Sequence, residues 1–176
     1  ISPNATNEEI YVAQKFARTA AGSHQIDTNT RRFYGKSFNS YIRVLQQAAA
    51  PTMIQRADML LAIGMDLRFD RSVLAVELRR AQKKGAHLVT IHPYEHSLSL
   101  TADQWLSPPE GATAEYLHSL NIACQEYQEQ GPPDEHPVDG IHQAAVRIMN
   151  ARFPMILFDP VLLQGRQGQR IISEIE

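Results

Sequence analysis

Two short apolar segments with a helical pattern between them constrain the fold of this chain more than any other feature. Residues 58–66 and 87–93 each contain an apolar run of strand length that a turn residue ends. Residues 71–84, which lie between them, show the spacing of apolar side chains that is typical of a helix. A strand, a helix and a second strand in this order predict a βαβ unit whose two strands run parallel.

Further patterns extend this unit into one domain. Strands are predicted over residues 59–63, 88–91, 104–106 and 155–158. Helices are predicted from residue 7 to about residue 20, over 38–49, 71–84, 112–127 and 141–151, and from about residue 168. Residues 24–37 are expected to be a loop with a brief strand at 25–27, and 128–140 a surface connection. We therefore expect residues 1–176 to form a single α/β domain, a three-layer, doubly wound, mostly parallel sheet.

Local signals define two of these helices. The Thr6 hydroxyl can accept from the Glu9 amide while the Glu9 carboxylate accepts from the Thr6 amide, which is a capping box. Gly22 can adopt the left-handed conformation that follows a last helical turn. The helix over 71–84 is expected to turn five apolar residues inward: Val73, Leu74, Val76, Leu78 and Ala81.

Composition excludes several classes of function. The chain is 43% hydrophobic and long enough to bury a sizeable core, and its net charge of −2 comes from well-mixed acidic and basic residues. No cationic face for nucleic acid or an anionic membrane is therefore expected. The single cysteine, Cys124, excludes an internal disulfide and an iron–sulfur cluster held by this chain alone, and we expect a buried, unreactive thiol.

The ends of the chain and its hydropathy predict how it is set in a larger protein. No apolar run approaches the roughly 18 residues that span a bilayer, so we expect a soluble domain without direct membrane insertion. The sequence begins with Ile1 rather than methionine and stops inside a predicted helix. We interpret it as an excised part of a larger subunit.

The candidate site lies where the two strands of the βαβ unit end, at Gly64, Asp66, His92 and Pro93. Ligands of parallel sheets bind at this edge, and Gly64 permits close backbone approach by a phosphate or nucleoside. The Asp66 carboxylate opposes a pyrophosphate there. His92 can donate to a ribose or stack on a base, and the alternative is a strand-end histidine without a ligand.

Neither a catalytic set nor a metal site is expected. The sequence has no nucleophile elbow and no phosphate-binding glycine loop. His92 and His96 are four residues apart, but both fall around a predicted loop at Pro93, so their spacing does not predict zinc. The segment Gly165-Arg166-Gln167-Gly168 lacks the dinucleotide-binding pattern and is interpreted as a turn and helix start.

Several motifs, in order, resemble the molybdopterin oxidoreductase superfamily. They are Thr6-Asn7-Glu8-Glu9, Gly22-Ser23-His24-Gln25-Ile26-Asp27, Ala57-Asp58, Leu78-Arg79-Arg80-Ala81-Gln82-Lys83-Lys84-Gly85-Ala86 and Thr101-Ala102-Asp103. The chain is similar to catalytic subunits of formate dehydrogenase and to the large iron–sulfur subunit (75 kDa type) of NADH-quinone oxidoreductase, complex I. The resemblance implies the Rossmann-like domain of that superfamily.

Departures from the family pattern bear on its cofactor. Where molybdenum-binding members show Asp-His-Cys-Ala-Arg-Leu-Cys-His, this chain has residues 27–34, which retain only Asp27 and Arg31. Where those members show Asp-Pro-Arg, it has His92-Pro93-Tyr94. The segment 64–70 and the C-terminal residues Arg152 to Phe158 are closer to the complex I subunit, which retains the fold without a metal cofactor.

The resemblance implies two functions, of which the first is the one these departures favour and the second is its alternative. In the first, this is a domain of the large subunit of an NADH-quinone oxidoreductase and mainly a scaffold, with iron–sulfur clusters elsewhere in the parent and no cofactor in this part. In the second, it binds one half of the molybdopterin guanine dinucleotide of a formate dehydrogenase-like enzyme. Both imply an oxidoreductase parent and neighbouring domains and subunits of a respiratory or formate-oxidising complex as partners. Both also imply a cytoplasmic location, free or at the inner membrane through partner subunits.

Overall fold

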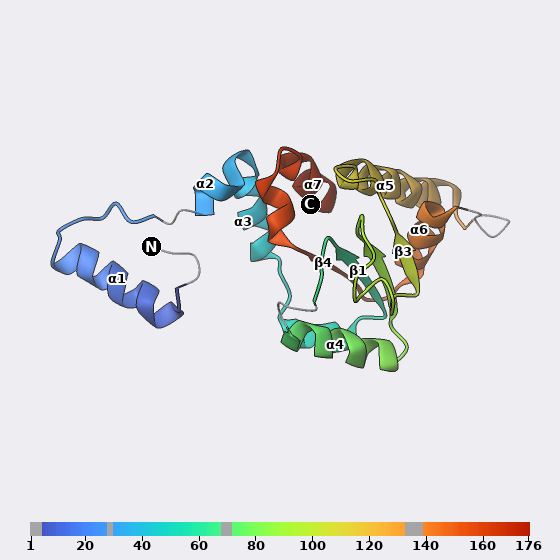
Figure 1. The fold of residues 1–176 in the computed structure, drawn as a ribbon, viewed down its shortest axis with the longest axis horizontal. Helices are drawn as coiled ribbons and strands as arrows, with labels where there is room; N and C mark the ends of the chain where they lie inside the picture. Colours follow the sequence, from blue (N-terminus) through green and yellow to red (C-terminus); the bar gives the residue numbers. More distant parts are fainter. Residues whose placement is uncertain (1–4, 28–29, 68–71, 133–138) are drawn as a thin grey trace.

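The structure, a computed structural model, describes residues 5–27, 30–67, 72–132 and 139–176, and these residues contain one four-stranded sheet (Figure 1). The strands are β1 (Met59–Ile63), β2 (His87–Ile91), β3 (Gln104–Leu106) and β4 (Pro154–Phe158). They lie in the order β3-β2-β1-β4, and every neighbouring pair is parallel. The parallel pairing of β1 with β2, in which Met59 lies opposite His87, confirms the predicted βαβ unit.

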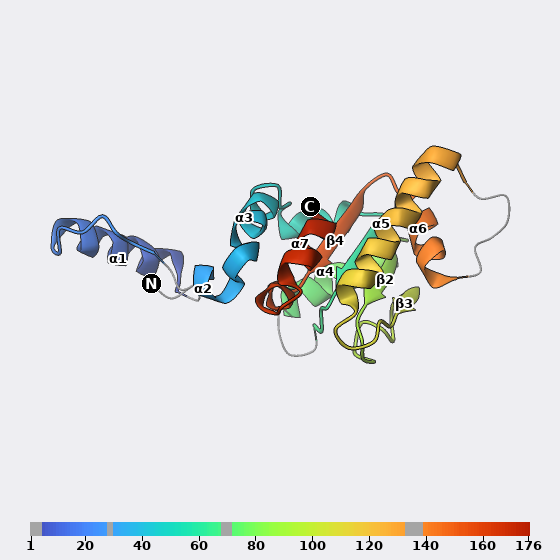
Figure 2. The same cartoon turned by 90° about the horizontal axis from the view of Figure 1, so that it is seen from above.

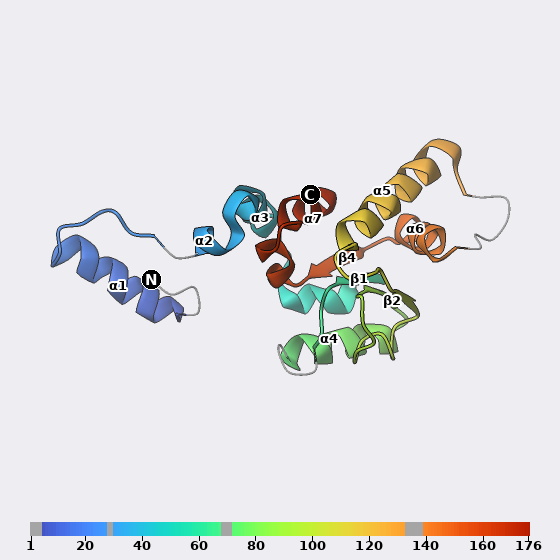
Figure 3. The ribbon, with the colours of Figure 1, turned by 45° about the horizontal axis from the view of Figure 1, so that its top comes forward.

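Helices cover both faces of this sheet (Figure 3). One face carries α4 (Ser72–Lys83) and the 3-10 helix η2 (Pro51–Arg56), and the other carries α5 (Thr113–Gln130), α6 (Gly140–Asn150) and α7 (Gly168–Ile175). The chain passes from β1 through α4 to β2 and β3, then returns over the opposite face to β4, beyond β1. The predicted class, a three-layer, doubly wound α/β fold, is confirmed, and its topological switch lies between β1 and β4.

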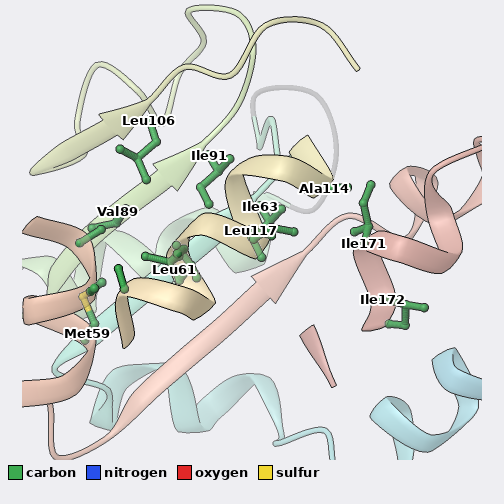
Figure 4. Close-up of a cluster of buried hydrophobic side chains, with 14 of the residues drawn as sticks. Met59, Leu61, Ile63, Val89, Ile91, Leu106, Ala114, Leu117, Ile171 and Ile172 are labelled. Atoms are coloured by element: carbon green, nitrogen blue, oxygen red, sulfur yellow. The ribbon is translucent and has the colours of Figure 1, made fainter. Parts of the chain in front are cut away.

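The core consists of two hydrophobic clusters, one on each face of the sheet. Figure 4 shows the larger cluster, to which Met59, Leu61 and Ile63 contribute together with side chains of α5 and α7. Leu60 and Ala62 point to the opposite face and pack with Leu78 of α4. All five residues of β1 are buried, because successive side chains of a strand alternate between two covered faces. This explains why the strand reads as a continuous apolar run.

The two Ala-Asp motifs hold the amino ends of neighbouring strands together. Asp58, just before β1, accepts hydrogen bonds from the backbone amides of Arg152 and Phe153 at 2.8 and 2.9 Å, next to the start of β4. Asp103, just before β3, accepts from the Leu88 amide of β2 at 2.7 Å. Each carboxylate thus replaces a ladder hydrogen bond that the sheet cannot yet make at that position.

Asp58 should make the stability of the fold depend on pH in the acidic range. The two backbone amides, chiefly that of Arg152, lower the pKa of Asp58 from its ordinary 3.8. The unfolded state therefore binds the proton more tightly, so the carboxylate stabilises the fold above about pH 4 and loses this effect as the pH falls further. We expect Asp58→Asn to lower the denaturation midpoint near neutral pH, and the gap from the wild type to narrow in acid.

Urea denaturation of both proteins over a range of pH values measures this gap. Glu129→Gln, at the exposed end of α5, is the control and should leave the midpoint unchanged throughout. A gap between Asp58→Asn and the wild type that stays constant down to the acid limit would contradict this role of Asp58.

The N-terminal part contains more helix than the sequence indicates. The loop expected over 24–37 is wrong, because α2 (Thr30–Tyr34) and the 3-10 helix η1 (Gly35–Ser37) occupy its second half. The brief strand expected at 25–27 is also wrong. The Arg31 guanidinium lies 5.1 Å from the centre of the Phe38 ring, and the rings of Tyr34 and Tyr41 are 4.8 Å apart. These contacts with α3 (Phe38–Gln46) stabilise helix in a segment without clear periodicity.

Helix α1 (Asn7–Thr19) lies apart from the sheet and its covering helices (Figure 2). Its capping box is confirmed, since the Thr6 amide donates to Glu9 Oε2 at 2.8 Å and the Glu9 amide to Thr6 Oγ1 at 3.3 Å. Gly22 has the expected left-handed conformation, with φ of 62°. No residue of α1 is buried in the described part of the chain.

Helix α4 faces the core with a different side from the one expected. Leu78 and Ala81 are buried as predicted, but the exposed fractions of Val73 and Val76 are 72% and 43%, so their inward placement is wrong. Helix α5 extends to Gln130, into the predicted surface connection 128–140. Residues 133–138 of that connection, and Arg71 at the predicted start of α4, lie outside the described residues.

Candidate functional site

A pocket of about 450 Å³ lies at the carboxyl edge of the sheet, which we call the strand-end pocket. Its lining comes from the segments that follow β1, β2, β3 and β4. The lining residues are Gly64, His92, Pro93, Tyr94, Gly111, Thr113, Leu162, Gly165, Arg166, Gln167 and Ile171. The pocket therefore coincides with the topological switch between β1 and β4, where doubly wound sheets bind their ligands.

Gly64 is required by the backbone and by its neighbour. Its φ is 62°, a conformation that residues with a side chain rarely adopt, and its amide donates to the Ile91 carbonyl at 2.8 Å. A Cβ at this position would lie 2.5 Å from Leu162 Cδ1. Leu162 belongs to the 3-10 helix η3 (Pro160–Gln164), so this side chain covers the glycine from the β4 side.

Asp66 does not line the strand-end pocket, unlike the other three predicted site residues, Gly64, His92 and Pro93. Its carboxylate accepts a hydrogen bond from Ser97 Oγ at 2.9 Å. Met65 and Leu67 on either side of it are buried in the α4 face of the core. The chain after β1 therefore directs Asp66 toward the loop after β2 rather than toward the pocket.

Two histidines with closely packed, tilted rings follow β2. The ring centres of His92 and His96 are 4.2 Å apart, and Nδ1 of each ring lies near the Tyr94 carbonyl, at 2.8 and 3.1 Å. Trp105 Nε1 donates to the His92 carbonyl at 2.8 Å and fixes the backbone there. Burial, together with repulsion from His92, lowers the pKa of His96, so its imidazole is neutral near pH 7.

Arg166 supplies a positive charge to the strand-end pocket that the sequence analysis did not assign. It lies between η3 and α7, in the segment that was interpreted as a turn and helix start, and α7 does begin at Gly168. No ion pair within the described residues engages its guanidinium. Arg166 lies eight residues after the end of β4, beyond the 3-10 helix η3, so no local sequence signal assigned it to the pocket.

The described residues contain no group of three or more histidine, cysteine, aspartate or glutamate side chains that could hold a metal ion. Cys124 is half-buried on α5, and burial raises the pKa of its thiol. Of the segment 27–34, residues 30–34 form α2, whereas 28–29 lie outside the described residues. In the same described part, no helix is both long and apolar enough to cross a membrane.

Comparison with known proteins identifies the family of this chain. The sequence matches the molybdopterin oxidoreductase family over residues 1–175. The chain belongs to the molybdopterin oxidoreductase family.

Individual relatives are named as oxidoreductases. The chain is 26% identical over 123 residues to the probable oxidoreductase YjgC of Bacillus subtilis, covering 68% of this chain and 12% of that protein. It is 26% identical over 129 residues to the F420-dependent formate dehydrogenase subunit alpha of Methanocaldococcus jannaschii, covering 71% and 19%. A putative formate dehydrogenase of Staphylococcus aureus is 27% identical over 123 residues, with 68% and 12% covered. The aligned region therefore spans less than a fifth of these relatives.

Proposed function

We propose that this chain is the domain of a formate-dehydrogenase-type molybdopterin oxidoreductase that holds one nucleotide half of the dinucleotide cofactor. The observation that carries the proposal is the charged Arg166 in a pocket at the topological switch. The names of the relatives favour the formate dehydrogenase branch. A molybdopterin cofactor in the parent protein follows from the family.

The residues of the strand-end pocket fit such a ligand in size and charge. Its volume of about 450 Å³ falls within the range of roughly 300 to 1,000 Å³ for small-molecule sites. Arg166 can donate two hydrogen bonds to a phosphate, and Asp66, which would repel one, is turned toward Ser97. His92 and Tyr94 offer flat faces for a base. When bound, the cofactor supplies the redox chemistry of the parent enzyme.

A second candidate is the scaffold function in the large subunit of an NADH-quinone oxidoreductase. The position of Leu162 favours it, because this side chain covers the glycine that a phosphate would approach. His92 also provides no carboxylate for a ribose. In either case we infer that residues 1–176 are part of a larger subunit. Iron–sulfur clusters and partner subunits of a respiratory or formate-oxidising complex would then lie outside this chain.

Nucleotide affinity distinguishes the two candidates. If the strand-end pocket holds a nucleotide, calorimetric titration with GDP should give a dissociation constant in the low micromolar range. A scaffold should bind worse than about millimolar, a difference of roughly 4 kcal/mol. Arg166→Gln should weaken binding by about 1.5 to 3 kcal/mol, the contribution of a hydrogen bond to a charged group.

Two further variants make the titration specific. Arg18→Gln, on α1 and away from the strand-end pocket, is the matched control and should bind GDP like the wild type. Leu162→Ala uncovers Gly64, so it should tighten binding if the phosphate approaches this glycine. Millimolar affinity in the wild type and in Leu162→Ala would contradict the cofactor proposal and favour the scaffold.

A further inference from the structure

The backbone of Tyr94 anchors the His92 ring at the strand-end pocket through both of its polar groups. The Tyr94 amide donates to His92 Nδ1 at 3.1 Å, and the Tyr94 carbonyl lies 2.8 Å from the same nitrogen. Nδ1 can therefore accept from the amide when it is bare and donate to the carbonyl when it carries a hydrogen. The other ring nitrogen, Nε2, makes no hydrogen bond to a described residue. His92 can thus gain or lose a proton while its ring keeps its anchor, and Nε2 is open to a ligand.

His96 is the neighbouring ring, and its surroundings keep it neutral. It is 4% exposed, and its ring centre lies 4.2 Å from that of His92. Its Nδ1 lies 3.1 Å from the Tyr94 carbonyl, which can only accept, whereas its Nε2 is buried and has no partner among the described residues. The neutral ring therefore carries its hydrogen on Nδ1. A charge on His96 would be desolvated and would repel a charged His92, and both effects lower the pKa of His96. The two rings together thus hold one charge at most, on the side of the pocket.

The other charges nearby favour an anion as the ligand of a charged His92. Asp66 attracts a proton toward His96, but burial and repulsion outweigh this attraction, and the carboxylate is engaged by Ser97. A hydrogen bond with Glu110 raises the pKa of Tyr94, so its phenol stays neutral. No described residue that lines the strand-end pocket is acidic, and Arg166 lines it as well. Among the described residues, the titratable or charged groups on the segments around the two rings and the pocket are Asp66, Tyr94, Glu95, Glu110 and Arg166.

We propose that the strand-end pocket takes up one proton when it binds an anionic phosphate group, and that His92 receives this proton while His96 stays neutral. The proton comes from the solvent and adds to the bare nitrogen of His92. Nδ1–H then donates to the Tyr94 carbonyl, and Nε2–H donates to the anion. Together with Arg166, the charged ring offers two cationic donors to the phosphates of a nucleotide. This inference rests on the proposed function, because it places the phosphates in the same pocket, and it adds that they bind more weakly as the pH rises.

Calorimetric titration with GDP, in buffers of different ionisation enthalpy, counts the protons taken up. At about pH 7.5, roughly one unit above the ordinary pKa of an imidazole, we expect at least about half a proton per GDP. The dissociation constant should rise with pH by up to about tenfold per unit, the slope of one linked proton. His92→Gln keeps an N–H donor but cannot take up a proton, so its uptake should vanish. His24→Gln, at an exposed histidine outside the pocket, is the matched control and should behave like the wild type.

Nitrogen NMR of the two rings locates the proton. With saturating GDP at the same pH, both nitrogens of His92 should carry hydrogen. His96 should be neutral, with its hydrogen on Nδ1, both with and without GDP. A charged His96, or a neutral His92 in the complex, would overturn the inference. GDP binding without proton uptake would also overturn it and would leave the nucleotide site standing.

Sulfate distinguishes a nucleotide from a simple oxyanion as the source of the negative charge. It takes up no proton near neutral pH, so any proton that accompanies its binding is taken up by the protein. Protonation of His92 by sulfate in a chain that does not bind GDP would support this inference and contradict the nucleotide proposal. Failure of both anions to bind would contradict the two together.

Discussion

Gly168→Ala should destabilise the fold, although replacing glycine in a helix usually stabilises it by roughly 0.5 to 1 kcal/mol. Gly168 begins α7 and is buried against η3. A Cβ there would lie 2.6 and 2.8 Å from the backbone C and Cα of Leu163, and closer still to its carbonyl oxygen. Backbone atoms cannot rotate away as a side chain does, so α7 has to move.

The expected loss is about 2 to 3 kcal/mol in the free energy of unfolding, the magnitude of an overpacked core. A shift of α7 also disturbs Ile171 and Ile172, which are 3% and 0% exposed in the larger core cluster. Equilibrium denaturation in urea measures the effect. Gly165→Ala, three residues earlier, is the matched control, because its φ is −81° and nothing lies within 4 Å of its Cβ position. Equal stability of the two variants would show that the α7 contact with η3 is loose.

Leu78→Ala should cost about 3 kcal/mol, because a fully buried leucine loses its packing and leaves a cavity. Leu78 is 0% exposed and packs in the cluster between α4 and the sheet. Val73→Ala on the same helix should change the free energy of unfolding by less than about 0.5 kcal/mol, because Val73 is 72% exposed. Thermal or urea denaturation compares the two directly. A cost for Val73→Ala near that of Leu78→Ala would mean that α4 packs as the sequence pattern suggests.

Leu78 and Val73 illustrate what the periodicity of apolar residues can and cannot predict. The pattern of α4 predicts a helix and includes its buried positions. Four apolar residues in succession over 73–76, however, leave the direction of the inner face uncertain by about the rotation of one residue. The contact of α4 with η2 selects Leu78 and Ala81. Which face of α4 is buried therefore depends on a neighbouring element, and the spacing of apolar residues within α4 carries no information about that element.

The strands were easier to predict than the helical N-terminal part. Residues 59–63 are buried on both faces, so their apolar run is continuous and its bounds are clear from the sequence. Residues 30–37 are helical through contacts such as those of Arg31 with Phe38 and Tyr34 with Tyr41. The residues that make those contacts show no helical spacing of apolar side chains in the sequence. The helix over this segment was therefore not predicted.

The site was predicted in its location and only partly in its members. The rule for parallel sheets places Gly64, His92 and Pro93 at the pocket because each follows a strand directly. The direction of Asp66 depends on Ser97, 31 residues away, and is not readable from the motif. Arg166 comes after β4 and η3, and only the return of the chain to the far side of β1 brings it to the same edge.

The carboxylates of Asp58 and Asp103 secure the amino edge of the sheet, whereas the strand-end pocket opens at the carboxyl edge. The two tasks are separated by the length of a strand. Residues that determine which ligand binds can therefore be substituted without breaking the hydrogen bonds that hold the strands together. A protein engineer could graft new loops after β1, β2 and β4, to accept another nucleotide or none, and leave Asp58 and Asp103 in place to preserve the framework.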